Sequence, residues 1–76
     1  MSIDIGNKFI HAEKTDHIIS GKPVFSIVNN HSGDEIAEVC WYATWKRYVV
    51  SVNDSTVFDV GCLKSIIAFI EKQPKD

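Results

Sequence analysis

The spacing of apolar positions along the chain changes once, at Asp59. Before Asp59, short runs rich in β-branched and aromatic residues are separated by turn-forming residues, which is the pattern of β-strands. After it, Leu63, Ile66, Ile67 and Ile70 recur at helical spacing. The pattern therefore predicts an α+β fold, a small antiparallel β-meander of about four strands with one C-terminal helix packed on one face.

The strands are expected between residues 22 and 58, and the helix over residues 59–73, in a single domain that spans residues 1–76. Residues 1–21 show no sustained period and predict an edge strand or an irregular arm. Turn formers punctuate the strand region at residues 29–34 and 53–55. The expected strands lie at residues 24–28, 36–42, 45–52 and 56–58.

The helix has recognisable ends. Asp59 is a typical N-cap residue, because its carboxylate can accept the free backbone N–H groups of the first turn. Pro74 is expected to stop the helix. Since Ile66 and Ile67 both lie on the predicted apolar stripe, replacing either with alanine is expected to cost about 2–5 kcal/mol of stability.

The central hairpin predicts two different sheet faces. If Ala43 and Thr44 form a two-residue loop, Tyr42 lies opposite Trp45 and Cys40 lies opposite Arg47. The face expected to receive the helix is nearly all apolar and consists of Ala37, Val39, Trp41, Tyr48, Val50 and Val52. The opposite face mixes aromatic and charged residues and consists of Ile36, Glu38, Cys40, Tyr42, Trp45, Arg47 and Val49.

The mixed face supplies the candidate binding residues. Tyr, Trp and Arg are enriched in the energetic centres of interfaces, so Tyr42, Trp45 and Arg47 are predicted to contact a partner, with Glu38 orienting Arg47 across the strand pair. Trp41 is expected to be structural. Two alternatives stay open, namely that residues 1–21 cover this face, or that a shifted register exchanges the two faces.

Composition and motifs narrow the function classes. A length of 76 residues excludes a second domain. The net charge of -2 disfavours a protein that coats nucleic acid without sequence preference. The usual nucleotide-binding and hydrolase motifs are missing, and the three histidines lack metal-ligand spacing. We therefore expect no enzymatic activity, no cofactor and no metal. Cys40 and Cys62 lie in apolar runs and are expected to be buried thiols rather than a disulfide.

Hydropathy bears on location. No run approaches the roughly 20 apolar residues that span a bilayer, and no basic leader precedes an apolar core at the N-terminus. These features predict a cytoplasmic protein without a membrane partner.

One resemblance covers about half the chain. The pattern Trp41-Tyr42-x-x-Trp45-Lys46-x-Tyr48, then residues 56–59, then Cys62-Leu63-x-x-Ile66-x-x-Phe69-Ile70, is similar to small uncharacterised proteins encoded by bacteriophages and prophages. That resemblance implies a phage accessory protein in the bacterial host cell, acting by binding and inhibiting a host protein such as a restriction or CRISPR factor. A homodimer is a companion expectation. The alternative is a single-stranded nucleic-acid-binding module, because aromatic and basic residues alternate around Trp45.

Overall fold

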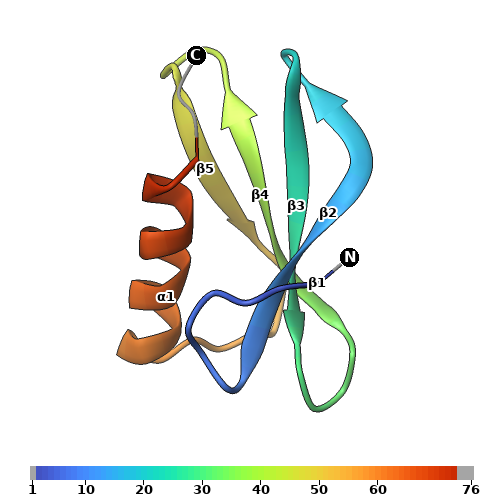
Figure 1. The fold of residues 1–76 in the computed structure, drawn as a ribbon, viewed down its shortest axis with the longest axis vertical. Helices are drawn as coiled ribbons and strands as arrows, with labels where there is room; N and C mark the ends of the chain where they lie inside the picture. The colour runs from blue at the N-terminus through green and yellow to red at the C-terminus, as the bar shows by residue number, and fades with distance from the viewer. Residues whose placement is uncertain (1, 74–76) are drawn as a thin grey trace.

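The computed structural model describes residues 2–73 as a five-stranded antiparallel sheet with one C-terminal helix (Figure 1). This confirms the predicted α+β class, with one strand more than expected. Each strand pairs with the strand that follows it in the sequence, so the order in the sheet is the order along the chain. The elements are β1 (Ser2–Ile3), β2 (Ile10–Ile19), β3 (Lys22–Asn29), β4 (Glu35–Tyr42), β5 (Arg47–Val52) and α1 (Val60–Glu71).

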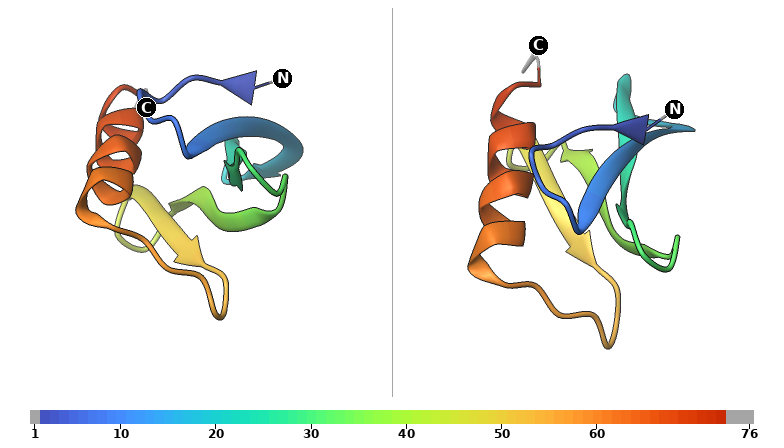
Figure 2. Two further views of the ribbon diagram at one scale, coloured as in Figure 1. Left: turned by 90° about the horizontal axis from the view of Figure 1, so that it is seen from below. Right: turned by 60° about the horizontal axis from the view of Figure 1, so that its bottom comes forward.

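The sheet is strongly curled, and α1 closes the open side of the curl between β1 and β5 (Figure 2). A side-chain hydrogen bond from Asn7 to Ser65, 3.3 Å long, ties the β1–β2 loop to the helix. The curl follows from the right-handed twist that every strand carries. As a result, one surface of the sheet and one side of the helix enclose a single core.

The core lies on the inner surface of the sheet. Ala37 and Val39 of β4 are fully buried there, as the alternation of the central hairpin predicts. The ring of Phe25 meets that of Phe69 edge-on, with centroids 5.0 Å apart. The buried cluster comprises Ile10, Ala12, Phe25, Ile27, Ala37, Val39, Cys62, Ile66 and Phe69, and Tyr48 and Val50 pack against it.

The expectation for residues 1–21 is right in part, because β1 is an edge strand of the sheet. Most of this segment forms β2, a ten-residue strand that pairs with β1 on one side and β3 on the other. Its apolar pattern is short because only Ile10 and Ala12 reach the core, whereas Ile18 and Ile19 lie in a solvent-exposed part of the β2–β3 hairpin. The segment therefore extends the sheet and does not cover the outer face of the central hairpin.

The stretch from Asn53 to Asp59 connects the sheet to the helix without forming a strand. The predicted strand at residues 56–58 is absent, and the Thr56 hydroxyl instead donates to the Asn53 carbonyl over 2.7 Å. Val57 is almost fully exposed, so no packing favours an extended ladder there. Asp59 is the N-cap as predicted, since its carboxylate accepts the Cys62 N–H at 2.8 Å.

The helix presents a different stripe to the core from the one predicted. Cys62, Ile66 and Phe69 are buried, whereas Leu63 and Ile67 are 48% and 55% exposed. Ile67→Ala is therefore expected to be less damaging than Ile66→Ala, which revises the equal cost predicted from the sequence. The helix ends at Glu71 with Lys72 as its C-cap, and Pro74, the expected stop, lies outside the described residues.

Candidate functional site

The tip of the β4–β5 hairpin is a four-residue loop, not the predicted two-residue turn. The Trp45 N–H donates to the Tyr42 carbonyl at 3.2 Å, and the Lys46 N–H donates to the Ala43 carbonyl at 3.3 Å. Lys46 takes a positive φ of 53° and returns the chain into β5. A two-residue hairpin turn requires residues that tolerate positive φ, which Ala43 and Thr44 do not. The longer loop moves that requirement to Lys46.

The longer loop shifts the hairpin register by two residues. Tyr42 lies opposite Arg47 and Trp41 lies opposite Tyr48, so the predicted pairing of Tyr42 with Trp45 is wrong. Because side chains alternate with a period of two, a two-residue shift leaves the paired residues 37–42 and 47–52 on their predicted faces. Ile36, predicted on the mixed face, lies at a register irregularity between β3 and β4 and packs against the core instead. Trp45, however, leaves the strand and becomes part of the loop.

Three of the four predicted binding residues come together at this tip. The rings of Tyr42 and Trp45 meet edge-on, with centroids 4.9 Å apart and planes at 89°. The Nε–H of Arg47 donates to the Trp45 carbonyl at 3.2 Å, which fixes the guanidinium stem beside the loop. Tyr42 is 43% exposed and Trp45 61% exposed. We call Tyr42, Trp45 and Arg47 the tip cluster.

Glu38 does not belong to the tip cluster. It pairs with Ser51 of β5, whereas Arg47 pairs with Tyr42, four residues further along β4. At about 3.3 Å per residue, this separates Glu38 from Arg47 by about 13 Å along the strands. The predicted orientation of Arg47 by Glu38 depended on the two-residue turn, so it is corrected with the register.

The other tryptophan of the hairpin lies on the inner surface, as expected. Trp41 and Tyr48 meet edge-on with centroids 5.3 Å apart, and burial raises the pKa of Tyr48. The Lys22 Nζ lies 4.7 Å from the centre of the Trp41 ring. Beside these rings, a groove of about 490 Å³ opens between the hairpin and the last turn of α1. We call it the hairpin groove, and it is lined by Trp41, Lys46, Arg47, Tyr48, Ile70 and Glu71.

The hairpin groove is not predicted by the sequence pattern. Lys22 reaches Trp41 only because β3 pairs with β4, and the β3–β4 register has no local sequence signal. Ile70 was assigned to the helical stripe, and Glu71 carried no signal of its own. The alternation of aromatic and basic residues at residues 45–48 was the one available hint.

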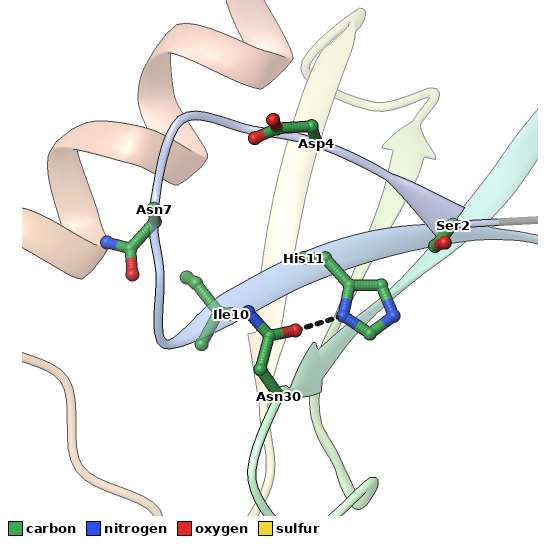
Figure 3. Close-up of a pocket in the computed structure, with 6 residues that line it drawn as sticks. All are labelled: Ser2, Asp4, Asn7, Ile10, His11 and Asn30. Carbon is green, nitrogen blue, oxygen red and sulfur yellow. Dashed lines mark hydrogen bonds between the residues drawn. The ribbon is translucent and has the colours of Figure 1, made fainter.

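A second pocket, of about 560 Å³, is lined by residues of β1, β2 and the β1–β2 and β3–β4 loops (Figure 3). His11 lines this pocket and is held at both ring nitrogens. Its Nδ1 meets Asn30 Oδ1, and its Nε2 lies 2.7 Å from Glu13 Oε2. The Asn30 amide nitrogen donates to the Lys8 carbonyl at 2.9 Å, which turns Oδ1 toward the imidazole. Both ring nitrogens therefore face acceptors, an arrangement that favours the imidazolium.

Most of the polar residues that line this second pocket make hydrogen bonds within the fold. The hydrogen bonds from His11 to Glu13 and then to Asn30 raise the pKa of the imidazole. A general base needs an unprotonated nitrogen that faces the reacting group, and His11 offers none in this arrangement. Asn7 accepts the Phe9 N–H and donates to Ser65, while Asp4 accepts the Gly6 N–H. The hydrogen bonds of His11 and Asn30 thus connect β2 and the β1–β2 loop to the β3–β4 loop, and we call this arrangement the His11 brace.

The thiols occupy different surroundings. Cys62 is buried in the core, whereas Cys40 lies half-buried on the outer face of β4. Because the two lie in different places, both are free thiols and form no disulfide with each other. Burial raises the pKa of each thiol, with a further contribution from Asp59 at Cys62 and from Glu38 at Cys40. A raised pKa keeps a thiol protonated and weakly nucleophilic. Within residues 2–73, no three His, Cys, Asp or Glu side chains are grouped to hold a metal ion.

Comparison with known proteins gives no assignment. No family model, no curated protein sequence and no solved structure matches the chain. The one helix of the described residues is too short to cross a membrane.

Proposed function

We propose that this chain is a binding module for another protein and that the tip cluster is its central contact. The observation that carries the proposal is the perpendicular pair of Tyr42 and Trp45, held at an exposed hairpin tip by two backbone hydrogen bonds. Large aromatic side chains are normally removed from water, and exposed aromatic patches are typical of interaction sites.

The tip cluster also has the rigidity that a contact site needs. Each aromatic side chain packs on the other, and the Arg47 Nε–H is held by the Trp45 carbonyl. Few side-chain rotations remain to be lost on binding, which lowers the entropic cost of association. Arg47 still has the rest of its guanidinium available to stack on a ring or clamp a carboxylate.

The resemblance to phage-encoded proteins gives the proposal its biological context. Short phage accessory proteins act by binding host proteins, so the expected partner is a protein of the bacterial cell. A restriction or CRISPR component whose activity the chain inhibits fits that context. This part of the proposal depends only on the resemblance to the class of short phage accessory proteins.

Capture from bacterial lysate tests the proposal with a matched pair of variants. The immobilised wild-type chain is expected to retain one stoichiometric protein, and Trp45→Ala is expected to lose it. Phe9→Ala is the control, because Phe9 is 57% exposed but lies in the β1–β2 loop away from the hairpin tip. Calorimetry with the purified partner should show that Trp45→Ala costs about 2 kcal/mol or more of affinity.

Two results would contradict the proposal. Equal capture by wild type and Trp45→Ala would exclude the tip cluster as the central contact. Tight binding of a generic single-stranded oligonucleotide, weakening steeply with salt, would favour the nucleic-acid alternative instead.

Self-association is the companion expectation. Val60, Leu63 and Ile67 form an exposed apolar stripe on α1, and a homodimer would cover such a stripe. Sedimentation velocity of wild type and Leu63→Glu over a concentration series measures it. A monomer at every concentration would exclude the homodimer and leave the tip cluster unaffected.

A further inference from the structure

The hairpin groove combines apolar walls with a basic rim. Trp41 and Tyr48 form one wall through their perpendicular rings, and Ile70 contributes from the last turn of α1. Lys46 and Arg47 stand at the rim, and both are exposed. The volume of about 490 Å³ lies within the range of pockets that bury a small ligand or a few side chains.

The positive charges around this groove exceed the negative ones. In the part of the chain that the structure describes, the only ion pair joins His11 to Glu13, so Lys46 and Arg47 form none there. Lys22 adds a third positive charge where its Nζ lies over Trp41. Glu71 is the one carboxylate of the lining.

The whole end of the molecule shares this charge. The β2–β3 turn, the β4–β5 turn and the C-terminal end of α1 all lie at the upper end in Figure 1. The charged residues near that end are Lys22, Lys46, Arg47 and Lys72, with Asp16 and Glu71. The loops at the opposite end carry Asp4, Asp34, Glu35, Asp54 and Asp59, with Lys8. An acidic partner is therefore attracted to the end that carries the tip cluster.

We infer that the hairpin groove binds an acidic segment of the protein partner, with a carboxylate between Lys46 and Arg47 and an apolar side chain against Trp41, Tyr48 and Ile70. The inference rests on the proposed function, because it specifies what part of the same partner lies beside the tip cluster. Charge-assisted hydrogen bonds to a carboxylate are stronger than neutral ones, and a guanidinium can form two at once.

A protein segment fits this groove better than a nucleic-acid strand. A strand presents a phosphate at every nucleotide, and Glu71 together with the carbonyl groups that end α1 would repel such a series. One or two carboxylates, spaced by apolar side chains, meet the cations with less repulsion from Glu71 than a continuous series of phosphates would. Nucleic-acid binding is accordingly an outcome that the test distinguishes.

Selection from a random peptide display library, with the full chain as target, tests the inference. The enriched peptides are expected to carry Asp or Glu next to an aromatic or aliphatic residue. A synthetic copy of the best peptide should bind Lys46→Glu about tenfold more weakly than wild type. Glu71→Gln should bind it more tightly. Lys64→Glu changes the charge equally on an exposed site of α1 outside the groove, and it should bind like wild type.

Nuclear magnetic resonance locates the peptide. The indole N–H signal of Trp41 should shift on titration, and a peptide in which Gln replaces each Glu and Asn each Asp should leave it nearly unmoved.

The opposing outcomes separate this inference from the proposed function. Peptides without acidic residues, or equal affinity for wild type and Lys46→Glu, overturn the acidic-segment inference, while loss of binding in Trp45→Ala still supports the tip cluster. Peptides that bind Trp45→Ala as well as wild type but bind Lys46→Glu weakly support the groove as the binding site. They overturn the tip cluster as the central contact. Selective binding of oligothymidylate instead of any peptide overturns both.

Discussion

The two tryptophans of the hairpin show how one residue type serves two roles a few positions apart. Trp41 points to the inner surface, where Tyr48 and Lys22 pack against its ring. Trp45 stands in the loop and touches Tyr42 at the tip. The difference follows from strand alternation for Trp41 and from the length of the loop for Trp45.

Alanine substitutions should separate these roles. Trp41→Ala removes a half-buried ring that packs on Tyr48 and lies under the Lys22 ammonium, so we expect a loss of about 2–3 kcal/mol in the free energy of unfolding. Trp45→Ala removes an exposed ring and should change it by less than about 0.5 kcal/mol. Urea denaturation followed by circular dichroism measures both. Unfolding of Trp45→Ala with a silent Trp41→Ala would reverse the two assignments.

His11 makes stability depend on pH. Its pKa is raised in the folded chain by the hydrogen bonds to Glu13 and Asn30, above the value of about 6.5 expected when unfolded. A raised pKa means that the folded state holds the proton more tightly. The stabilisation from His11 is therefore complete below about pH 6.5 and is lost as the pH rises through the folded-state pKa.

Thermal unfolding across this pH range checks the expectation. His11→Gln should remove the part of the pH dependence that lies above about pH 6.5. His31→Gln is the control, because His31 is exposed in the β3–β4 turn. A melting temperature that rises through neutral pH in wild type would contradict a stabilisation by protonated His11.

The elements show which parts of the fold local sequence can predict. The α+β class, the Asp59 N-cap and the inner face of β4 follow from residues near each other in the chain, and these were predicted. The hairpin register was wrong by two residues, which left the strand faces correct because the error was even. The path of β2 was missed because only two of its residues, Ile10 and Ala12, reach the core.

The helix shows why some residues of a core-facing stripe can be assigned wrongly from the sequence. Apolar residues occupy more than one side of α1, so periodicity alone cannot choose between Leu63 and Cys62, or between Ile67 and Phe69. The edge-on contact of Phe69 with Phe25 favours the observed side. Tertiary packing therefore determines which side of α1 faces the core, and the local sequence pattern does not.

The corrected stripe gives a direct test in neighbouring residues. Ile66 is 3% exposed and should cost about 2–5 kcal/mol when replaced by alanine, because a cavity opens in the core. Ile67 is more than half exposed, so Ile67→Ala should cost less than about 1 kcal/mol. Chemical denaturation of the two variants compares them. Equal losses would mean that α1 is rotated about its axis from the position described.

At the scale of the whole molecule, the up-and-down path of the chain sorts its loops into two sets. One set lies at the upper end in Figure 1 and contains the tip cluster and the hairpin groove. The other contains the His11 brace and most of the acidic loop residues. The proposed binding residues and the His11 brace therefore lie at opposite ends of the sheet, so we expect substitutions at the hairpin tip to leave the brace undisturbed.

The pairing of each strand with its neighbour in the chain also has a consequence for how the molecule folds. Successive hairpins close only short loops, which is the topology of fast folding. The helix is different, because the Asn7–Ser65 bond joins residues 58 positions apart. We therefore expect the hairpins of the meander to form first and the docking of α1 to come last. The barrier to folding then reflects how slowly the two ends of the chain meet.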